Sequence, residues 1–387
     1  MKNEIIGIVG AGAMGSGIAQ VAAQAGHKVM VYDTNQDQIE RASGNLHQIF
    51  EKLVSKEKFT QQEADSILRR IQWVDNLHEL EDCHLVIEAI VEKLEAKRSV
   101  FEVLDSILSE DAILASNTSS LSIASISGAA KDPGRVIGIH FFNPAPLMPL
   151  VEIIPSLATR KAVVDQCVQL IDSWKKTTVL AKDTPGFIVN RVARPFYSES
   201  LKMYEEGVAD IPTIDWALRE VGGFRMGPFE LMDLIGHDVN YVVTETVWTQ
   251  FYYDPRFKPS ITQKRLLEAG MLGRKSGKGF YDHSGNGANP TPDTDFVRGE
   301  EIVDRVLYML INEAADALFM GIGTARDIDL AMTKGVNYPK GLLQWADEKG
   351  IENVVKYLDD LFDEFRDNRY RCCPLLRRMA RSGKTFF

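Results

Sequence analysis

The strongest constraint on the fold of this chain is a glycine-rich turn set directly between an apolar strand and a helical segment. Residues 5–9 (IIGIV) form a short apolar run, which is typical of a buried strand. Residues 10–15 (GAGAMG) follow and fit the spacing GxGxxG, and a helical pattern then continues to Gly26. The spacing alone also occurs in turns of other folds, but this context favours a site for dinucleotide phosphates.

Each glycine of the turn meets a different physical requirement of dinucleotide binding. Gly10 allows a tight turn, Gly12 lets a pyrophosphate approach the backbone, and Gly15 lets the helix pack close to the strand. The amides at the start of the helix would face the phosphates. The predicted phosphate-binding segment comprises Gly10, Ala11, Gly12, Ala13, Met14 and Gly15.

A second strand, residues 28–33, ends at Asp33, near the offset of ~20 residues at which an acid binds the ribose. The Asp33 carboxylate can accept hydrogen bonds from both ribose hydroxyls and would repel a 2′-phosphate. Residues 34–36 (TNQ) contain no basic side chain to bind one. We therefore expect NAD rather than NADP, the alternative being that Asp33 only caps the following turn.

Further apolar runs continue the alternation of strands and helices through the first half of the chain. They lie at residues 85–90, 112–116, 136–142 and 150–154. This alternation predicts an α/β fold with a Rossmann-like, doubly wound sheet. After about Asp183 the apolar residues recur at every third and fourth position, so we expect an all-helical C-terminal region.

The helical region contains a duplication. Residues 188–192 (IVNRV) match residues 302–306 (IVDRV), and the same register aligns further separated residues. These pairs are Glu199 with Glu313, Gly207 with Gly321, and 214–215 with 328–329. One register that aligns several separated positions indicates two copies of a structural unit. Asn190 of the first copy becomes Asp304 in the second.

We therefore predict three domains. A nucleotide-binding domain spans residues 1–183, a first helical copy spans 184–285, and a second spans 296–387. Residues 283–295 (HSGNGANPTPDTD) between the copies are rich in Gly, Asn and Pro, which is typical of a linker.

Polar residues at the ends of three predicted strands are candidates for chemistry. Residues 116–120 (SNTSS) end one strand, His140 lies near the end of the next, and Glu152 is the single charge in an apolar run. Prolines between the last two runs predict a turn that brings them side by side. Imidazole beside a carboxylate is a suitable base for oxidising an alcohol, because the carboxylate stabilises the imidazolium. Each residue also has a plain structural interpretation: a core histidine, an edge glutamate and a turn or cap.

Composition excludes several other classes of function. The formal net charge is −10, which does not attract nucleic acid or an anionic membrane. The apolar runs are far shorter than the ~18 residues of a membrane span, and no targeting segment is visible. The four cysteines show no metal-ligand spacing, so we expect reduced thiols, no bound metal and a cytoplasmic location.

In combination, these stretches resemble the 3-hydroxyacyl-CoA dehydrogenase family. The resemblance rests on GAGAMG, SNTSSL, HFFNPAPLMPLVEII, DTPGFIVNRV, GPFELMDLIG and GRKSGKGFY, which run in order to about Tyr281. It implies NAD-dependent, reversible oxidation of an (S)-3-hydroxyacyl-CoA to a 3-ketoacyl-CoA, in fatty-acid or related acyl-CoA degradation. The rest of the chain is similar to the repeated C-terminal unit of longer members, which include 3-hydroxybutyryl- and 3-hydroxyadipyl-CoA dehydrogenases.

The resemblance also implies roles for individual residues. His140 looks like the catalytic base with Glu152 as its partner, and Ser119 and Asn190 look like the pair that binds the substrate oxygen. The residues that resemble cofactor contacts are Glu92, Lys97, Ser119, Asn143 and Lys275.

The CoA-binding side matches less closely. The family has a lysine in the helical excursion after the second strand, where this chain places Glu57 between Lys56 and Lys58. Lys56 is therefore the candidate substrate contact, with a solvated helix face as the alternative.

Two other functions remain as alternatives, and the oligomeric state is open. A dehydrogenase of free β-hydroxyacids would use a catalytic lysine in place of the HFFNP histidine. A non-catalytic NAD-binding protein, similar to the lens crystallins related to this family, would need no intact His140 or Glu152. We expect a homodimer, or a monomer whose second helical copy imitates the dimer interface.

Overall fold

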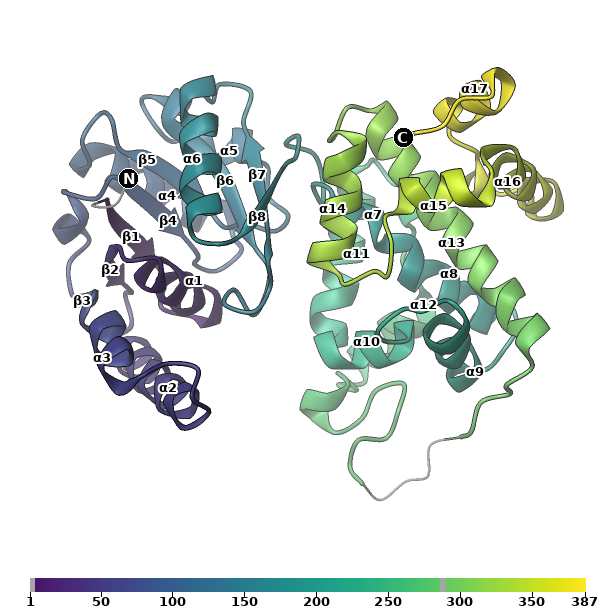
Figure 1. The fold of residues 1–387 in the computed structure, drawn as a ribbon, viewed down its shortest axis with the longest axis horizontal. Coiled ribbons are helices and arrows are strands. Elements are labelled where there is room, and N and C mark those ends of the chain that lie inside the picture. The colour runs from purple at the N-terminus through teal and green to yellow at the C-terminus, as the bar shows by residue number, and fades with distance from the viewer. Residues whose placement is uncertain (1–3, 286–289) are drawn as a thin grey trace. The chain divides into compact units, whose positions relative to one another are not determined.

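The structure is a computed structural model that describes residues 4–285 and 290–387. Its contacts divide the chain into two compact units, one up to Thr184 and one from Pro185 onward (Figure 1). Residues 286–289 of the predicted linker lie outside the described residues. Within those residues, no helix combines the length and the apolar character that crossing a membrane requires.

The first unit alternates strands and helices, as predicted. Its strands are β1 (Ile5–Val9), β2 (Lys28–Tyr32), β3 (Ile71–Val74), β4 (Leu85–Glu88), β5 (Ile113–Ser116), β6 (Val136–Phe141), β7 (Leu150–Pro155) and β8 (Thr177–Leu180). Its helices are α1 (Ala13–Gln24), α2 (Gln36–Ser55), α3 (Gln61–Arg69), α4 (Leu94–Ile107), α5 (Ile123–Ser127) and α6 (Lys161–Ser173).

The strands form one sheet in the order β3-β2-β1-β4-β5-β6-β7-β8. Every neighbouring pair is parallel except β6 and β7, which are antiparallel. This confirms the doubly wound Rossmann-like fold. The sequence analysis did not predict β3 and β8, which are short and carry half-exposed residues.

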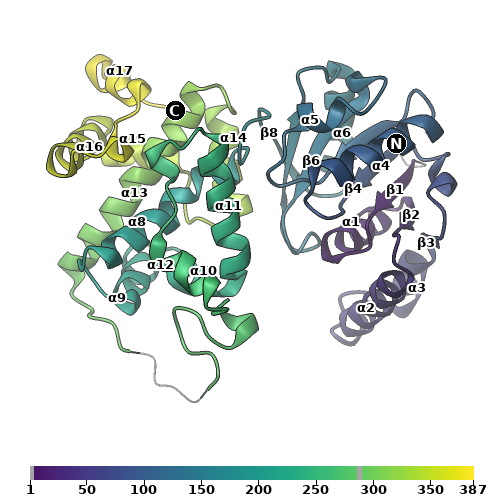
Figure 2. The same cartoon turned by 180° about the vertical axis from the view of Figure 1, so that it is seen from behind.

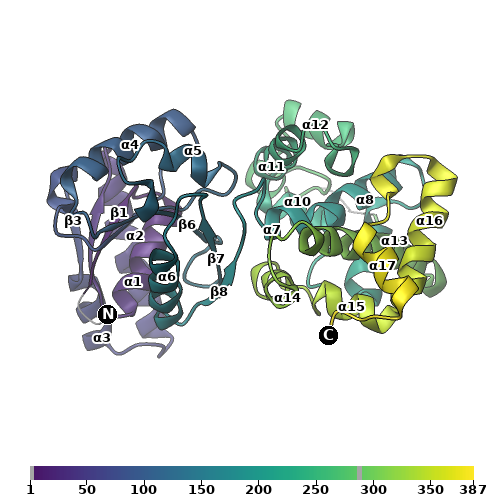
Figure 3. The same cartoon turned by 90° about the horizontal axis from the view of Figure 1, so that it is seen from above.

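Helices cover both faces of the sheet. Side chains of α1, α2, α3 and α6 share one core with alternate strand residues such as Ile87, Ile139 and Val151. Helices α4 and α5 pack on the opposite face, which Figure 2 shows from behind and Figure 3 from above. Carboxyl ends of the parallel strands β1, β4, β5 and β6 meet at one edge of the sheet, the edge at which doubly wound proteins bind ligands.

The described part of the second unit is helical. The first stretch contains α7 (Val189–Val192), α8 (Arg194–Glu205), α9 (Ile211–Trp216), α10 (Pro228–Ile235), α11 (His237–Gln250) and α12 (Ile261–Glu268). The second contains α13 (Phe296–Phe319), α14 (Ala325–Gly335), α15 (Leu342–Lys349), α16 (Ile351–Phe365) and α17 (Pro374–Ser382).

The two stretches repeat one another helix by helix. Glycines with positive φ recur at matching positions: Gly207 (72°) with Gly321 (64°), and Gly236 (97°) with Gly350 (84°). One difference is that α7 and α8 are separate helices, whereas the matching part of α13 is continuous. Pro195 explains the break, because proline lacks the N–H that a continuous helix would need there.

Reciprocal buried ion pairs link the two copies: an arginine of each copy binds a glutamate of the other. Arg191 Nε of the first copy lies 2.6 Å from Glu313 Oε1 of the second. At the matching positions, Arg305 Nε of the second copy lies 3.2 Å from Glu199 Oε2 of the first. All four side chains are at most 8% exposed. The copies therefore contact each other through related surfaces, as the two halves of a symmetric dimer do.

The match extends to the last residues of the sequence. Asp233 accepts hydrogen bonds from the N–H groups of Phe280 and Tyr281. At the matching position, Asp347 accepts hydrogen bonds from the N–H groups of Phe386 and Phe387. Residues 383–387 (GKTFF) thus repeat residues 277–281 (GKGFY), a similarity that the sequence analysis missed.

The reciprocal ion pairs predict a large effect of a single substitution in the core of the helical unit. Arg305→Met removes an ion pair of the fully buried Glu199, whose other partners among the described residues are Arg369 and Tyr370. We expect the free energy of unfolding to fall by about 3 kcal/mol, the lower end of the range for breaking a buried pair. Urea unfolding followed by circular dichroism measures the change.

The matched control is Lys356→Met, which removes an exposed ion pair with Asp360 on α16. The expected change there is below about 1 kcal/mol. Equal effects of the two substitutions would contradict the importance of the buried pair.

Candidate active site

The glycine-rich turn lies at the carboxyl end of β1, where it opens α1. Gly10 has a φ of 106°, and a Cβ atom there would lie 2.6 Å from the Ala89 carbonyl oxygen. A Cβ atom on Gly15 would lie 1.8 Å from the Gly10 carbonyl oxygen, so α1 approaches this turn too closely for any side chain. A Cβ atom on Gly12 would meet no atom within 4 Å. The turn therefore has open space at Gly12, which fits the phosphates of a dinucleotide.

Asp33 lies beside this turn, directly after β2. Its Oδ2 accepts a hydrogen bond from the Ala11 N–H at 2.7 Å, and its Oδ1 accepts one from the Asn35 N–H at 2.9 Å. Gln38 donates to the Ala11 carbonyl oxygen, which ties α2 to the same turn. The two features predicted to bind a dinucleotide thus contact each other, and the carboxylate is held close to the phosphate-binding backbone.

A buried acid and a buried lysine organise the loop after β4. Lys97 is 1% exposed, and its Nζ lies 2.7 Å from Glu88 Oε1 and 3.1 Å from Glu92 Oε2. Glu88 also accepts hydrogen bonds from the Ile90 N–H and the Ser116 hydroxyl. Burying these charges requires such a full set of partners. Lys97 therefore lies behind Glu92 and fixes it.

Glu92 in turn binds the turn that follows β5. Its Oε1 accepts hydrogen bonds from the hydroxyls of Thr118 and Ser120 and from the N–H groups of Ser119 and Ser120. Burial acts to raise the pKa of Glu92, but Lys97 and these hydrogen bonds outweigh it and lower the pKa below its ordinary value. Glu92 is thus an ionised acid at neutral pH that shapes the Ser119 backbone.

His140 and Glu152 lie opposite each other on the antiparallel strands β6 and β7. His140 Nδ1 lies 2.7 Å from Glu152 Oε2, and both side chains are buried. They project from the face of the sheet that α5 covers, since a Cβ atom on the neighbouring Gly138 would touch Ile123 of that helix. The predicted side-by-side arrangement of the two runs is therefore what the structure shows.

The end of β6 is tied to the turn after β5. Asn117 Oδ1 accepts a hydrogen bond from the Phe141 N–H at 2.8 Å. Thr118 directly follows Asn117, and His140 directly precedes Phe141, so this bond brings the two segments together. Beyond the strand, Asn143 is exposed and its peptide bond to Pro144 is cis. Glu92, Ser119 and His140 are thus carried by segments that directly bind one another at one edge of the sheet.

The remaining predicted residues are carried by other segments of the chain. Asn190 is half-buried on the single turn of α7, in the helical unit. Lys275 follows α12 in the same unit and forms an ion pair with Asp238 of α11. Lys56 is exposed at the end of α2, next to Glu57, whose φ of 55° is left-handed.

Glu88 was missed by the sequence analysis, and Ser116, Asn117 and Thr118 were named there only as members of a polar stretch, without roles or partners. Glu88 did give a signal, because it is a lone acid at the end of an apolar strand. The other three belong to the SNTSS stretch, whose position at a strand end was noticed but whose bonding partners lie far away in sequence.

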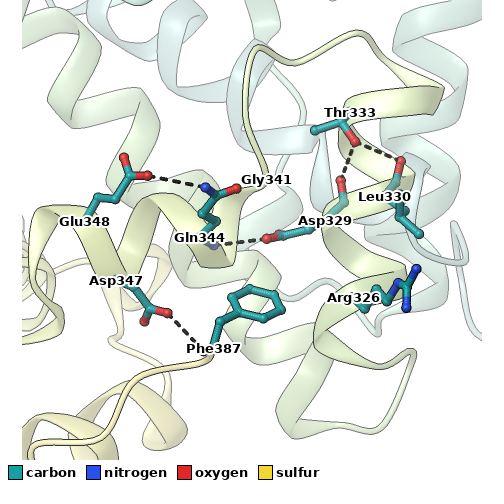
Figure 4. A pocket seen from close by; sticks show the side chains of 9 residues that line it. All are labelled: Arg326, Asp329, Leu330, Thr333, Gly341, Gln344, Asp347, Glu348 and Phe387. Atoms are coloured by element: carbon teal, nitrogen blue, oxygen red, sulfur yellow. Dashed lines mark hydrogen bonds between the residues drawn. The ribbon is translucent and has the colours of Figure 1, made fainter.

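A cavity of about 600 Å³ lies in the second helical copy, where Arg326, Asp329 and Gln344 line it (Figure 4). In the first copy, the Tyr281 hydroxyl donates to Asp215, the counterpart of Asp329, at 2.7 Å. Phe387 replaces that tyrosine in the second copy and points its ring toward the cavity. None of the predicted site residues is among those that line this cavity.

Comparison with protein families covers nearly the whole chain. The family described as "3-hydroxyacyl-CoA dehydrogenase, NAD binding domain" matches residues 5–184. The family described as "3-hydroxyacyl-CoA dehydrogenase, C-terminal domain" matches residues 186–283 and again residues 302–385.

Individual relatives agree with this match. The chain is 37% identical to a 3-hydroxyadipyl-CoA dehydrogenase of Escherichia coli, over 97% of each protein. It is 39% identical to a 3-hydroxybutyryl-CoA dehydrogenase of Bradyrhizobium diazoefficiens, over 74% of this chain and 97% of that protein. A crystal structure of a 3-hydroxybutyryl-CoA dehydrogenase from Escherichia coli superimposes with a TM-score of 0.94 at 35% identity, covering 98% of this chain and 99% of that one.

These matches agree with the open phosphate site at Gly12 and with the resemblance found in the sequence. The chain belongs to the 3-hydroxyacyl-CoA dehydrogenase family and is an NAD-dependent oxidoreductase acting on 3-hydroxyacyl-CoA.

Proposed function

We propose that His140 is the catalytic base of this oxidation and that Glu152 orients its ring and stabilises the imidazolium that forms when His140 takes up a proton. The observation that carries the proposal is the 2.7 Å contact between His140 Nδ1 and Glu152 Oε2. An ionised carboxylate can only accept a hydrogen bond, so Nδ1 donates and the lone pair of the imidazole lies on Nε2. Nε2 then takes the hydroxyl proton of the substrate, and Glu152 stabilises the imidazolium that forms.

The substrate oxygen is held by Ser119 and Asn190 in this proposal. Ser119 is supported by its place in the turn that Glu92 and Asn117 fix. Asn190 is supported by its match to the family motif DTPGFIVNRV and by its replacement with Asp304 in the second copy. Two hydrogen bonds to one oxygen align the hydroxyl with its base and favour a single reactive geometry.

The cofactor is bound by the turn of residues 10–15, with Asp33 on the adenosine ribose. Glu92, Asn143 and Lys275 are further cofactor contacts, and Lys97 contributes by fixing Glu92. When bound, NAD would supply the acceptor for the hydride that leaves the carbon bearing the hydroxyl. The chain positions both partners and removes the proton.

The CoA portion is proposed to contact Lys56. This lysine is exposed at the end of α2, and the neighbouring Lys58 is exposed as well. A phosphate needs positive charge more than a fixed side-chain position, so either ammonium can serve. Glu57 between them would weaken this contact.

The substrate class is a short-chain 3-hydroxyacyl-CoA, with 3-hydroxyadipyl-CoA as the first candidate. The support is that a relative of that name matches along the full length, including the second helical copy. The 3-hydroxybutyryl-CoA dehydrogenase of Bradyrhizobium diazoefficiens matches 74% of this chain. A structure carrying the same name also matches along the full length, over 98% of the chain, at 35% identity against 37% for the 3-hydroxyadipyl-CoA relative. 3-Hydroxybutyryl-CoA is therefore the second candidate.

We also propose that the chain comprises an NAD-binding domain (1–183) and two helical domains of common origin (184–285 and 296–387). The second imitates the partner subunit of a dimer, as the reciprocal ion pairs between Arg191 and Glu313 and between Arg305 and Glu199 suggest. This arrangement allows a monomer without excluding a dimer.

The two glycines of the cofactor turn should respond in different ways to the same substitution. Gly12→Ala places its methyl group in open space, so the fold should persist while binding of NADH weakens about tenfold or more, or about 1.4 kcal/mol. Gly15→Ala meets backbone at 1.8 Å, so it should destabilise the domain itself. Thermal unfolding and NADH fluorescence titration separate the two effects. Unchanged NADH affinity in folded Gly12→Ala would contradict the proposed phosphate site.

His140→Ala should lower kcat by about 10² to 10⁴-fold, which is the usual contribution of positioned proton transfer. Glu152→Gln should lower it as well, because the amide cannot stabilise an imidazolium by charge. The assay is reduction of acetoacetyl-CoA by NADH, with NADH affinity measured separately and expected to be unchanged. The control is His47→Ala, which replaces an exposed histidine on α2 and should keep wild-type activity. Full activity of His140→Ala would refute the proposal.

The substrate candidates are distinguished by a matched set of acyl-CoA compounds. We expect kcat/KM to be higher for 3-hydroxyadipyl-CoA than for 3-hydroxyhexanoyl-CoA, which has the same chain length without the terminal carboxylate. A preference for 3-hydroxybutyryl-CoA over both would favour the second candidate. Comparable values for all three would show that this chain does not select the acyl tail.

A further inference from the structure

The two arginines of the reciprocal ion pairs, Arg191 and Arg305, follow different residues in the sequence. Arg191 directly follows Asn190, whereas its counterpart Arg305 directly follows Asp304. We propose that Glu313 and Asp316, on α13 of the second copy, are positioning residues for Asn190 and act through Arg191. This inference rests on the role proposed above for Asn190, and it gives the second copy a part in the reaction.

Helix α7, which carries Asn190, has little stability of its own. It comprises the four residues Val189–Val192, a single turn that would not persist in isolation. Gly186 (φ 74°) and Phe187 (φ 47°) precede it in left-handed conformations, and Pro195 prevents it from continuing into α8. The position of this turn therefore depends on tertiary contacts.

Arg191 supplies buried ion pairs among these contacts. Its side chain is 1% exposed, and its guanidinium binds two acids of α13: Nε lies 2.6 Å from Glu313 Oε1, and the terminal nitrogen lies 2.7 Å from Asp316 Oδ2. The guanidinium also lies 5.0 Å from the centre of the Phe251 ring. A planar group held by two acids and an aromatic face has one orientation, which fixes the backbone of the adjacent Asn190.

The two acids are themselves fixed by a second arginine. Arg256 lies 3.3 Å from Glu313 Oε2 and 2.8 Å from Asp316 Oδ2 through the same nitrogen. Two arginines thus face two carboxylates in a buried cluster, with Asp254 as a further partner of Arg256. Glu313 is one of the acids that contact both arginines, so Glu313→Gln removes the ion pair of Arg191 Nε and the guanidinium must take a new position.

The counterpart in the second copy provides no such connection. Asp304 is paired with Lys349 at 2.7 Å, and Arg305 binds Glu199, Glu206 and the Tyr370 hydroxyl. Glu199 and Glu313 occupy matching positions, are equally buried and bind matching arginines. Glu199→Gln is therefore a control that perturbs the same kind of contact without neighbouring Asn190.

The experiment compares Glu313→Gln with Glu199→Gln in the full-length protein. Steady-state kinetics with acetoacetyl-CoA and NADH are measured at a temperature at which circular dichroism shows both variants folded. We expect Glu313→Gln to raise KM for acetoacetyl-CoA and to lower kcat/KM at least about tenfold, because a small displacement of a positioning group has effects of this size. KM for NADH should stay unchanged. Glu199→Gln should leave both KM values unchanged, since a loss of folded enzyme lowers only kcat.

A double-mutant cycle tests the route through Asn190. If Glu313 acts through Asn190, Glu313→Gln should cause little further loss in an Asn190→Ala background. A full additional loss in that background would overturn the inference, as would kinetics of Glu313→Gln that equal those of Glu199→Gln. Full activity of Asn190→Ala alone would instead overturn the role proposed for Asn190, an outcome that the single variants identify separately.

Discussion

The pairing of a buried histidine with a buried glutamate is the constraint on which the rest of this site depends. Glu152 has no exposed surface, and a carboxylate in that position needs hydrogen-bonding partners. The antiparallel reversal between β6 and β7 supplies one by placing His140 directly opposite. In an otherwise parallel sheet, this single reversal brings an acid and a base into register at the edge where the cofactor turn also lies.

The same rule for buried charge explains how the loops around this pair keep their shape. Glu88 and Lys97 form a buried ion pair at the carboxyl end of β4, and Lys97 also forms an ion pair with Glu92. Glu92 then orders the backbone that carries Ser119. In the helical unit, arginines and acids exchanged between the two copies have the corresponding effect on α7. The reactive groups are thus supported by ion pairs rather than by the loops alone.

Much of this could be predicted from sequence because the relevant signals are local. The glycine turn, Asp33 and the alternation of strands and helices lie within short segments, and the histidine and glutamate stand out in apolar runs. The duplication was visible as a constant register. Pairing across the proline-rich turn followed from the short connection between the two runs.

What escaped prediction depends on contacts between distant segments. The burial of Lys97 follows from Glu88, a residue on the preceding strand, and composition alone would place a lysine at the surface. The role of Asn117 follows from its bond to Phe141 on another strand. Strands β3 and β8 carry half-exposed residues that leave a weak apolar signal. The ion pairs between the copies could not be predicted without knowing how the matching helices of the two copies pack against each other.

The most direct test of the central claim is a crystal structure of the protein with NAD and acetoacetyl-CoA bound. The account predicts that His140 Nε2 lies within hydrogen-bond distance of the acetoacetyl 3-oxygen, at about 2.6–3.2 Å, with Nδ1 still bound to Glu152. A His140 ring directed away from the nicotinamide, or a different side chain in contact with that oxygen, would contradict it.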